Sequence, residues 1–274
     1  MRNLILLTFS LATLSFSCKD NSSRVNLNLI KSDWISEDDN FHGAYLFIQD
    51  SLMIESLTNG ESPISPYKII KDTLIIYSRD FDYNPISLSI KRIWKFKILS
   101  VDTCNLIIKP AFPNSIGTLI FKRINQPKRN DLTVEELEFS YTGGYGFSQD
   151  LRIEKDGTLF HYGYSGFSKY NGLSKSKLDS GLFGRIQRII YTIHKDSLNL
   201  YYPGAVTSNF FLFIKTKSDS IQIEGVPDSF TDSKLKYLID YLMALEYLVK
   251  LDTSIDENIR FKYKINSEFN NKTN

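Results

Sequence analysis

Apolar and polar residues alternate through much of the first half of the chain, which is the period of a β-strand with one buried face. Three runs place an Asp and a Ser or Thr between apolar stretches: IQDSLMIES at 48–56, IIKDTLIIYS at 69–78 and SVDTCNLIIKP at 100–110. Asp, Ser and Thr side chains bond the backbone in tight turns, so each run predicts a β-hairpin. Residues 29–125 therefore predict an antiparallel meander of about eight strands, which closes or nearly closes into a small barrel because a long meander must protect its edges.

The alternation breaks at NQPKRND, residues 125–131, where Pro127 and a cluster of charges mark a domain boundary. Beyond the boundary we expect a strand around residues 136–138. A hairpin, LRIEKDGTLFHY, follows, because its central Asp-Gly dipeptide suits a type I′ turn. A short strand is expected at 169–175.

Helical periodicity appears twice in the second half, across LDSGLFGRIQRIIYTIH at 178–194 and DSKLKYLIDYLMALEYLVKL at 232–251. Thr231 and Asp232 can cap the second helix. Two further strands, NFFLFIKT and SIQIEGV, lie between the helices. This succession of strands and helices predicts an α+β domain over 131–251, an antiparallel sheet with two helices, followed by a polar tail at 252–274.

The N-terminus has the order of an export signal, with Arg2 in a short cationic start, the apolar run LILLTFSLATL, and small residues before Cys18. The apolar run is too short to span a membrane as a helix. LSFS before Cys18 resembles the lipobox of bacterial lipoproteins, which implies a signal peptide at 1–17, palmitate-type acyl chains on Cys18 and a tether at 18–28. Ordinary secretion, with Cys18 incidental, is the alternative.

The residues after Cys18 bear on which side of the membrane the protein faces. Lys19-Asp20-Asn21 resembles part of the export signal of Bacteroidetes-type surface lipoproteins. The resemblance implies a lipid anchor in the bacterial outer membrane. It leaves two orientations open, facing the periplasm or exposed at the cell surface.

Three stretches of the first half suggest a family: LIKSDWISEDDNFHGAYLFIQDSL, SPYKIIKDTLIIYS and FKILSVDTCNLIIKP. Together they resemble lipocalin-like lipoprotein domains of Bacteroidetes type, which implies a small β-barrel and, by analogy, a cavity for an apolar ligand. Barrels of this size are commonly filled by side chains. We therefore expect the interior to be occupied by Trp34, Phe47, Trp94 and Phe96.

The second half carries a Gly-rich stretch YTGGYGF at 141–147, the DGT hairpin at 156–158, Tyr162-Gly163 and Gly172. These features resemble a domain of unknown function found in secreted Bacteroidetes-type proteins. That family has no assigned activity, so the resemblance implies a fold and no mechanism.

The net charge and the cysteine content add little to these predictions. The net charge of +2 becomes +1 when Arg2 leaves with the signal, which gives no field for nucleic acid or an acidic membrane. Lipidation of Cys18 would leave Cys104 as the only thiol, without an intrachain disulfide partner, and we expect it to be a small buried hydrophobe.

No catalytic constellation is apparent. The histidines, His42, His161 and His194, are scattered and spell no metal motif. The acidic clusters at 37–39 and 135–138 flank turns and are expected to face solvent. We predict no enzyme activity, no catalytic or metal-binding residues and no cofactor.

The stretch FHYGYSGFSKY at 160–170 places Phe160, Tyr162 and Tyr164 on one strand, with Tyr170 near its return. These rings could form an exposed platform for a protein or glycan partner. They could instead be a sheet face packed beneath a helix, which is the interpretation we favour. Two functions follow: a non-catalytic binding or scaffold lipoprotein, or a carrier of an apolar small molecule inside the barrel.

Overall fold

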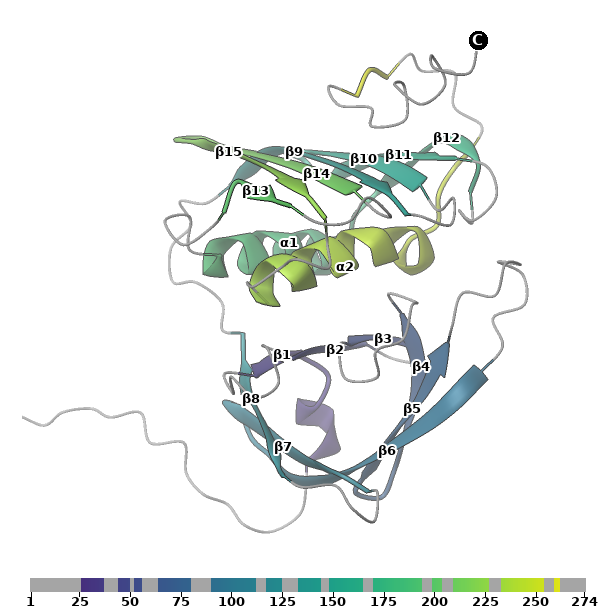
Figure 1. The fold of residues 1–274 in the computed structure, drawn as a ribbon, viewed down its shortest axis with the longest axis vertical. Helices are drawn as coiled ribbons and strands as arrows, with labels where there is room; N and C mark the ends of the chain where they lie inside the picture. The colour runs from purple at the N-terminus through teal and green to yellow at the C-terminus, as the bar shows by residue number, and fades with distance from the viewer. Residues whose placement is uncertain are drawn as a thin grey trace, which may run out of the picture.

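The computed structural model consists of three layers: a β-barrel, a pair of helices and a β-sheet (Figure 1). It describes residues 26–36, 44–49, 52–55, 64–79, 90–111, 117–124, 133–143, 148–164, 170–193, 199–203, 209–226, 233–253 and 259–261. Several sequence predictions lie outside these residues, namely the signal peptide, Cys18, His42, His194, Thr231 and Asp232. In the described part of the chain, no helix has the length and hydropathy needed to cross a membrane.

The first eight strands form a closed antiparallel barrel, so the predicted meander and its closure are confirmed. Strand β1 pairs with β8, with Trp34 opposite Arg123, and this pairing removes both edges. The strands are β1 (Asp33–Ser36), β2 (Tyr45–Gln49), β3 (Leu52–Glu55), β4 (Ser65–Ile70), β5 (Thr73–Arg79), β6 (Ile90–Val101), β7 (Asn105–Pro110) and β8 (Leu119–Arg123).

The barrel interior is filled by one contiguous cluster of apolar side chains that includes Trp34 and Phe96, as predicted. The short 3-10 helix η1 (Leu27–Leu29) lies inside the barrel (Figure 1). Trp34 Nε1 donates a hydrogen bond of 2.8 Å to the carbonyl oxygen of Ile30, which holds this segment in place. Trp94 is only partly buried against the cluster.

Phe47 does not fill the barrel, so that prediction is wrong. Its neighbours Leu46 and Ile48 belong to the interior cluster. Successive side chains of a strand point to opposite faces, so Phe47 lies on the outer wall, where it joins the core formed with the helices.

Cys104 lies in the turn between β6 and β7, where Asp102 Oδ1 accepts hydrogen bonds from the backbone N–H groups of Cys104 and Asn105. Cys104 is half-buried. The expectation that Cys104 is a small buried hydrophobe is therefore wrong.

The second module is a seven-stranded sheet of order β12-β11-β10-β9-β14-β15-β13. Gly157 in the predicted DG turn has φ of +83°, the left-handed conformation that glycine adopts readily. Asp156 does not have a positive φ, so the prediction of a type I′ turn is wrong, although the hairpin is present. Strand β13 was not predicted, and it pairs with β15 in parallel. The strands are β9 (Val134–Thr142), β10 (Ser148–Glu154), β11 (Thr158–Gly163), β12 (Gly172–Lys177), β13 (Tyr201–Tyr202), β14 (Asn209–Thr216) and β15 (Ser220–Gly225).

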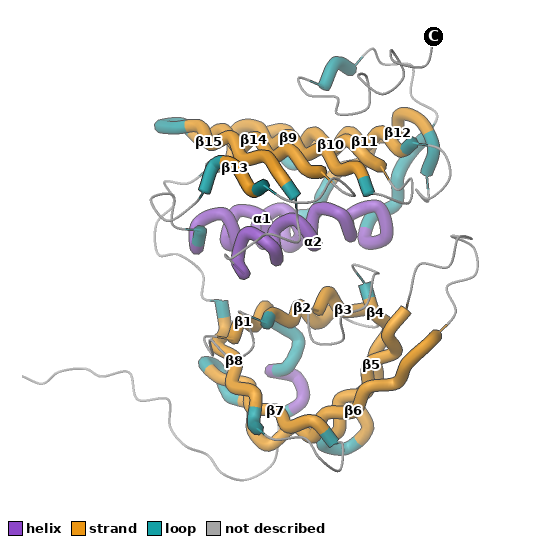
Figure 2. The backbone as a smooth tube through the Cα atoms, viewed as in Figure 1, coloured by secondary structure: helices purple, strands orange, loops and turns teal. Residues whose placement is uncertain are grey.

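Both predicted helices are present, α1 (Ser180–Thr192) and α2 (Ser233–Leu248). Asp179 caps α1, because its Oδ1 accepts the Leu182 N–H at 2.7 Å. The helix pair lies between the sheet and the barrel (Figure 2). One core cluster accordingly joins the helices to sheet residues such as Phe139 and Leu151 and to barrel-wall residues such as Tyr45 and Phe47.

Candidate functional site

The predicted aromatic residues of β11 lie on the sheet face that points away from the helices. Leu159 belongs to the helix-side core. Phe160 and Tyr162 alternate with Leu159 and His161 along β11, so they face outward. The favoured interpretation, a sheet face packed beneath a helix, is therefore wrong for these two rings.

Carboxylates accompany the aromatic rings on this outer face. Asp150 of β10 lies directly opposite Tyr162 of β11. Tyr164 Oη donates a hydrogen bond of 2.5 Å to Asp150 Oδ2, and the Tyr162 and Tyr164 ring centroids are 4.9 Å apart. Glu138 of β9 lies one position further along the same face, opposite Arg152. We call Glu138, Asp150, Phe160, Tyr162 and Tyr164 the outer-face site.

Most of the outer-face site is shielded from solvent. Phe160, Glu138 and Asp150 are buried, whereas Tyr162 and Tyr164 are half-buried. Glu138 is 2 % exposed, so the expectation that the acidic cluster at 135–138 faces solvent is wrong at this residue. Tyr170 lies elsewhere, since it packs against the core on the helix side.

The chain's own C-terminal segment borders the outer-face site. Beyond α2 the backbone runs along the sheet edge, where Lys175 and Asp252 exchange two backbone hydrogen bonds of 2.8 Å. Further along the chain, residues 259–261 lie on the outer side of the sheet (Figure 1), and Arg152 Nη1 donates to the Arg260 carbonyl oxygen at 3.4 Å. Arg152 Nη2 also lies 3.7 Å from a Glu136 carboxylate oxygen and 3.4 Å from a Glu154 carboxylate oxygen.

A second polar cluster lies beneath the sheet, against α2. His161 Nδ1 is 3.2 Å from Ser174 Oγ, and His161 Nε2 is 3.7 Å from Glu246 Oε2. Gln149 of the neighbouring strand occupies the same face, and its side-chain amide has no hydrogen-bond partner among the described residues. Burial lowers the pKa of His161 to about 4, so the imidazole is neutral at pH 7.

Ser174 contacts His161, and His161 in turn contacts Glu246; these are the residue types of nucleophilic catalysis. The geometry nevertheless favours a structural function. Each of the three side chains has 0 % exposure, so no substrate can reach Ser174. Ser174 Oγ also donates to the His161 carbonyl oxygen at 3.3 Å, which ties it to the neighbouring strand. Sequence reasoning missed this cluster because its members come from β11, β12 and α2.

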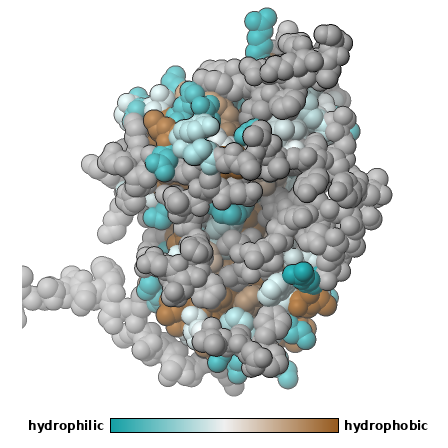
Figure 3. Space-filling view, in the orientation of Figure 1, coloured by the Kyte–Doolittle hydropathy of each residue, from teal (hydrophilic) through white to brown (hydrophobic). Residues whose placement is uncertain are grey.

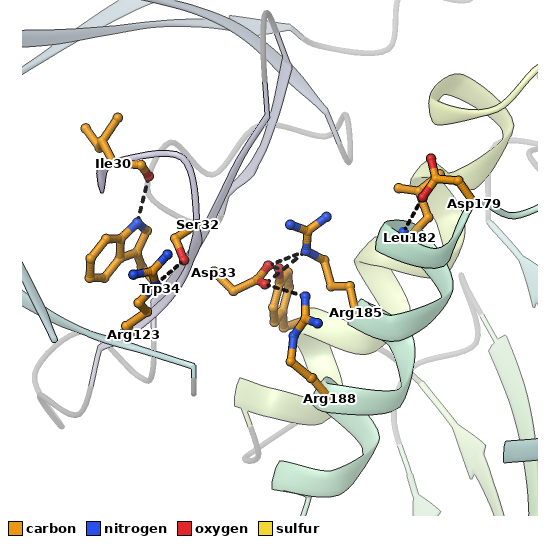
Figure 4. Close-up of polar contacts among 10 residues, drawn as sticks. Ile30, Ser32, Asp33, Trp34, Arg123, Asp179, Leu182, Arg185 and Arg188 are labelled. Carbon is orange, nitrogen blue, oxygen red and sulfur yellow. Dashed lines mark hydrogen bonds and ion pairs between the residues drawn. The ribbon is translucent and has the colours of Figure 1, made fainter. Parts of the chain in front are cut away.

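A third cluster joins the barrel to the helices. Arg185 and Arg188 of α1 point toward Asp33 of β1 (Figure 4). Arg185 Nε lies 2.7 Å and 2.9 Å from the two Asp33 carboxylate oxygens, Arg188 Nη2 lies 3.6 Å away, and Tyr237 Oη donates to Oδ1 at 2.6 Å. Burial, together with the Asp33 charge, holds the pKa of Tyr237 well above its usual value, so the phenol remains a donor.

Aromatic contacts surround this ion pair. The Arg185 guanidinium lies 3.8 Å from the ring centroid of Phe47, and the rings of Tyr45 and Tyr237 stack at 4.8 Å. Tyr45 Oη also donates to Asp240, whose Oδ2 lies 3.0 Å from Lys236 Nζ. Burial raises the pKa of Asp240 to about 7, while the nearby ammonium favours the charged form. These contacts hold the barrel and the helices together as one body.

Among the described residues, no group of three or more His, Cys, Asp or Glu side chains is arranged to hold a metal ion. Neither the family models nor the curated proteins contain a match to this chain. The interpretation of the three clusters therefore depends on their geometry.

Proposed function

We propose that the protein is a non-catalytic binding or scaffold lipoprotein, held in the bacterial outer membrane by acyl chains on Cys18. The observation that supports binding is the outer-face site, where Tyr162 and Tyr164 lie beside the Asp150 carboxylate on the sheet face opposite the helices. Aromatic rings stack on the apolar faces of sugars or anchor protein partners, and carboxylates accept hydrogen bonds from hydroxyl groups. A glycan offers apolar faces to the aromatic rings and hydroxyl groups to the carboxylate.

The contacts between barrel and helices support the scaffold part of the proposal. Asp33, Arg185 and Tyr237 connect the module nearer the N-terminus to the module that carries the outer-face site. A rigid connection holds a binding face at a set position relative to an anchor. The N-terminal module then serves as a spacer between membrane and partner.

The alternative function is a carrier of an apolar small molecule. A closed eight-stranded antiparallel barrel is an architecture compatible with lipocalin-like binding proteins. Trp34, Phe96, Phe121 and the segment around Ile30 fill this interior with one apolar cluster, which favours a structural core over a ligand cavity.

We expect the outer-face site to bind glycans. On a glycan array, the double variant Tyr162→Ala/Tyr164→Ala should lose at least tenfold in affinity, because it removes both stacking rings and the hydrogen bond to Asp150. Tyr201→Ala is the matched control, since Tyr201 is 63 % exposed and lies on β13 at the far edge of the sheet. Equal binding by the double variant and wild type would contradict this assignment, as would a wild-type protein that binds no glycan.

We expect the mature protein to begin at Cys18 with thioether-linked diacylglycerol. Mass spectrometry of the N-terminal peptide measures this directly, and Cys18→Ser should leave an unprocessed, unlipidated chain. Protease treatment of intact cells then distinguishes a surface-exposed chain, which is cleaved, from a chain that faces the periplasm, which is protected.

The reactivity of the Cys104 sulfur also tests whether Cys18 carries a lipid. The chain has two cysteines, and a sulfur atom in a disulfide cannot also carry a thioether lipid. Lipidation of Cys18 therefore excludes a disulfide between Cys18 and Cys104, and a thiol-specific reagent would then label Cys104 in the denatured protein. A chain with no lipid and no reactive thiol would overturn the lipid anchor.

A further inference from the structure

The barrel wall opposite the helices carries a concentration of exposed lysines. Strands β1 to β3 supply the wall that meets the helices, through residues such as Ile35, Tyr45 and Ile54. The outer surfaces of β4 to β8 face away from that junction (Figure 1). They present five lysines, which we call the basic face: Lys68, Lys95, Lys97, Lys109 and Lys122.

The strand register brings these lysines close together. Lys68 and Lys95 lie on either side of Ile75 in one row across β4, β5 and β6. Lys97 and Lys109 are direct cross-strand neighbours in the next row. Like charges directly opposite one another destabilise a sheet, so this arrangement favours a negatively charged partner.

Exposed aliphatic side chains lie among the lysines. Ile70 is 54 % exposed, Ile93 53 %, Leu99 44 % and Ile120 47 %. These four make up most of the exposed large hydrophobic residues of the described chain. Figure 3 shows hydrophobic and hydrophilic residues close together over the barrel half of the molecule.

Few carboxylates offset the basic face. Of the described acidic residues on β4 to β8 and their turns, Asp72 lies 3.8 Å from Lys97, and Asp102 accepts hydrogen bonds within its own turn. The overall charge of the chain, +2, understates this local field because most acidic residues of the first half precede β4.

We propose that the basic face lies on the surface of an anionic phospholipid membrane. The lysines would contact head-group phosphates, while the aliphatic side chains reach the boundary between head groups and acyl chains. A membrane satisfies both features at once, because it presents a negative surface above an apolar layer. Each lysine near such a surface contributes about fivefold to affinity.

This proposal rests on the proposed lipid anchor and adds which face of the barrel lies against the membrane. Only eight chain steps separate Cys18 from Asn26, where the described fold begins. At about 3.4 Å per residue, this tether spans about 27 Å at most, so a lipid on Cys18 would keep the barrel close to the bilayer.

The test uses the mature chain from Lys19, without lipid, so its outcome is independent of lipidation at Cys18. We expect this chain to co-sediment with vesicles that contain phosphatidylglycerol and not with vesicles of phosphatidylcholine alone. The triple variant Lys95→Gln/Lys97→Gln/Lys109→Gln should lose at least tenfold in vesicle affinity. The matched control, Lys155→Gln/Lys177→Gln/Lys215→Gln, removes the same charge from lysines that are 59 %, 57 % and 51 % exposed on the second module, and should bind as wild type does.

A further variant distinguishes a membrane from other polyanions. Ile93→Ser/Ile120→Ser should weaken vesicle binding severalfold and leave any binding to double-stranded DNA unchanged. The proposal is overturned if wild type ignores phosphatidylglycerol vesicles or if both triple variants lose affinity equally. It is also overturned if the isoleucine variant binds vesicles as wild type does, which would indicate general polyanion binding.

Discussion

Replacing Arg185 by alanine is expected to destabilise the protein by about 3–5 kcal/mol, because it leaves the buried Asp33 carboxylate without its closest cation. Arg185 Nε contacts both Asp33 oxygens, and Asp33 is 4 % exposed. The same substitution removes the guanidinium from the face of Phe47. Denaturant unfolding followed by circular dichroism measures the loss.

Two variants serve as controls for the Arg185 experiment. Arg188→Ala should cost less, because Arg188 Nη2 lies 3.6 Å from Asp33 and the carboxylate keeps Arg185. Lys177→Ala removes a cation from Asp156 at the surface, where both side chains are more than half exposed, and should change stability by less than about 1 kcal/mol. An Arg185→Ala protein as stable as Lys177→Ala would show that the junction between barrel and helices contributes little.

The second large effect is a pH dependence from His161, which should destabilise the fold by about 3 kcal/mol between neutral pH and pH 4. Burial lowers the pKa of His161 from its ordinary 6.5 to about 4. Below pH 6.5 the His161 imidazole binds a proton in the unfolded chain but not in the folded chain. The free energy of unfolding therefore falls as the pH is lowered and levels off near pH 4. Above pH 6.5 the imidazole is neutral in both states and the effect vanishes.

The measurement compares wild type with His161→Gln across this pH range. The comparison is needed because Asp240, whose pKa is raised to about 7, has the opposite effect, stabilising the fold as the pH falls from about 7 to 4. In the difference between the two proteins, the contributions of Asp240 and the other histidines cancel. A difference that is independent of pH would contradict a neutral buried His161.

Local patterns were enough to predict most of the secondary structure. The Asp-Ser/Thr turns located three hairpins of the barrel, and Asp156-Gly157 located the β10–β11 turn, because these side chains act on their own backbone. The alternation of apolar and polar residues was enough to expect Trp34 and Phe96 in the barrel interior. It did not show that Phe47 faces outward, because an apolar residue suits either the barrel interior or the contact with the helices.

The candidate sites depended on contacts between residues that are distant in the sequence. His161 and Glu246 meet because α2 packs on the face of the sheet that includes β11. Phe160 and Tyr162 were recognised as neighbours on one strand face, yet the side on which the helices pack could not be derived from their spacing. Glu138 looked like a surface acid in its local context and is buried in the sheet.

The sequence alone therefore determined the period of each segment, the positions of the turns and the expectation of a closed eight-stranded barrel, since these follow from interactions within a few residues. Only the tertiary structure decided which face of each strand is covered, that Asp33 meets Arg185, and that five lysines scattered from Lys68 to Lys122 share one wall. The physical reason is that a strand's alternation defines two faces without specifying what packs on either. That choice is made by helices and strands far away in the chain.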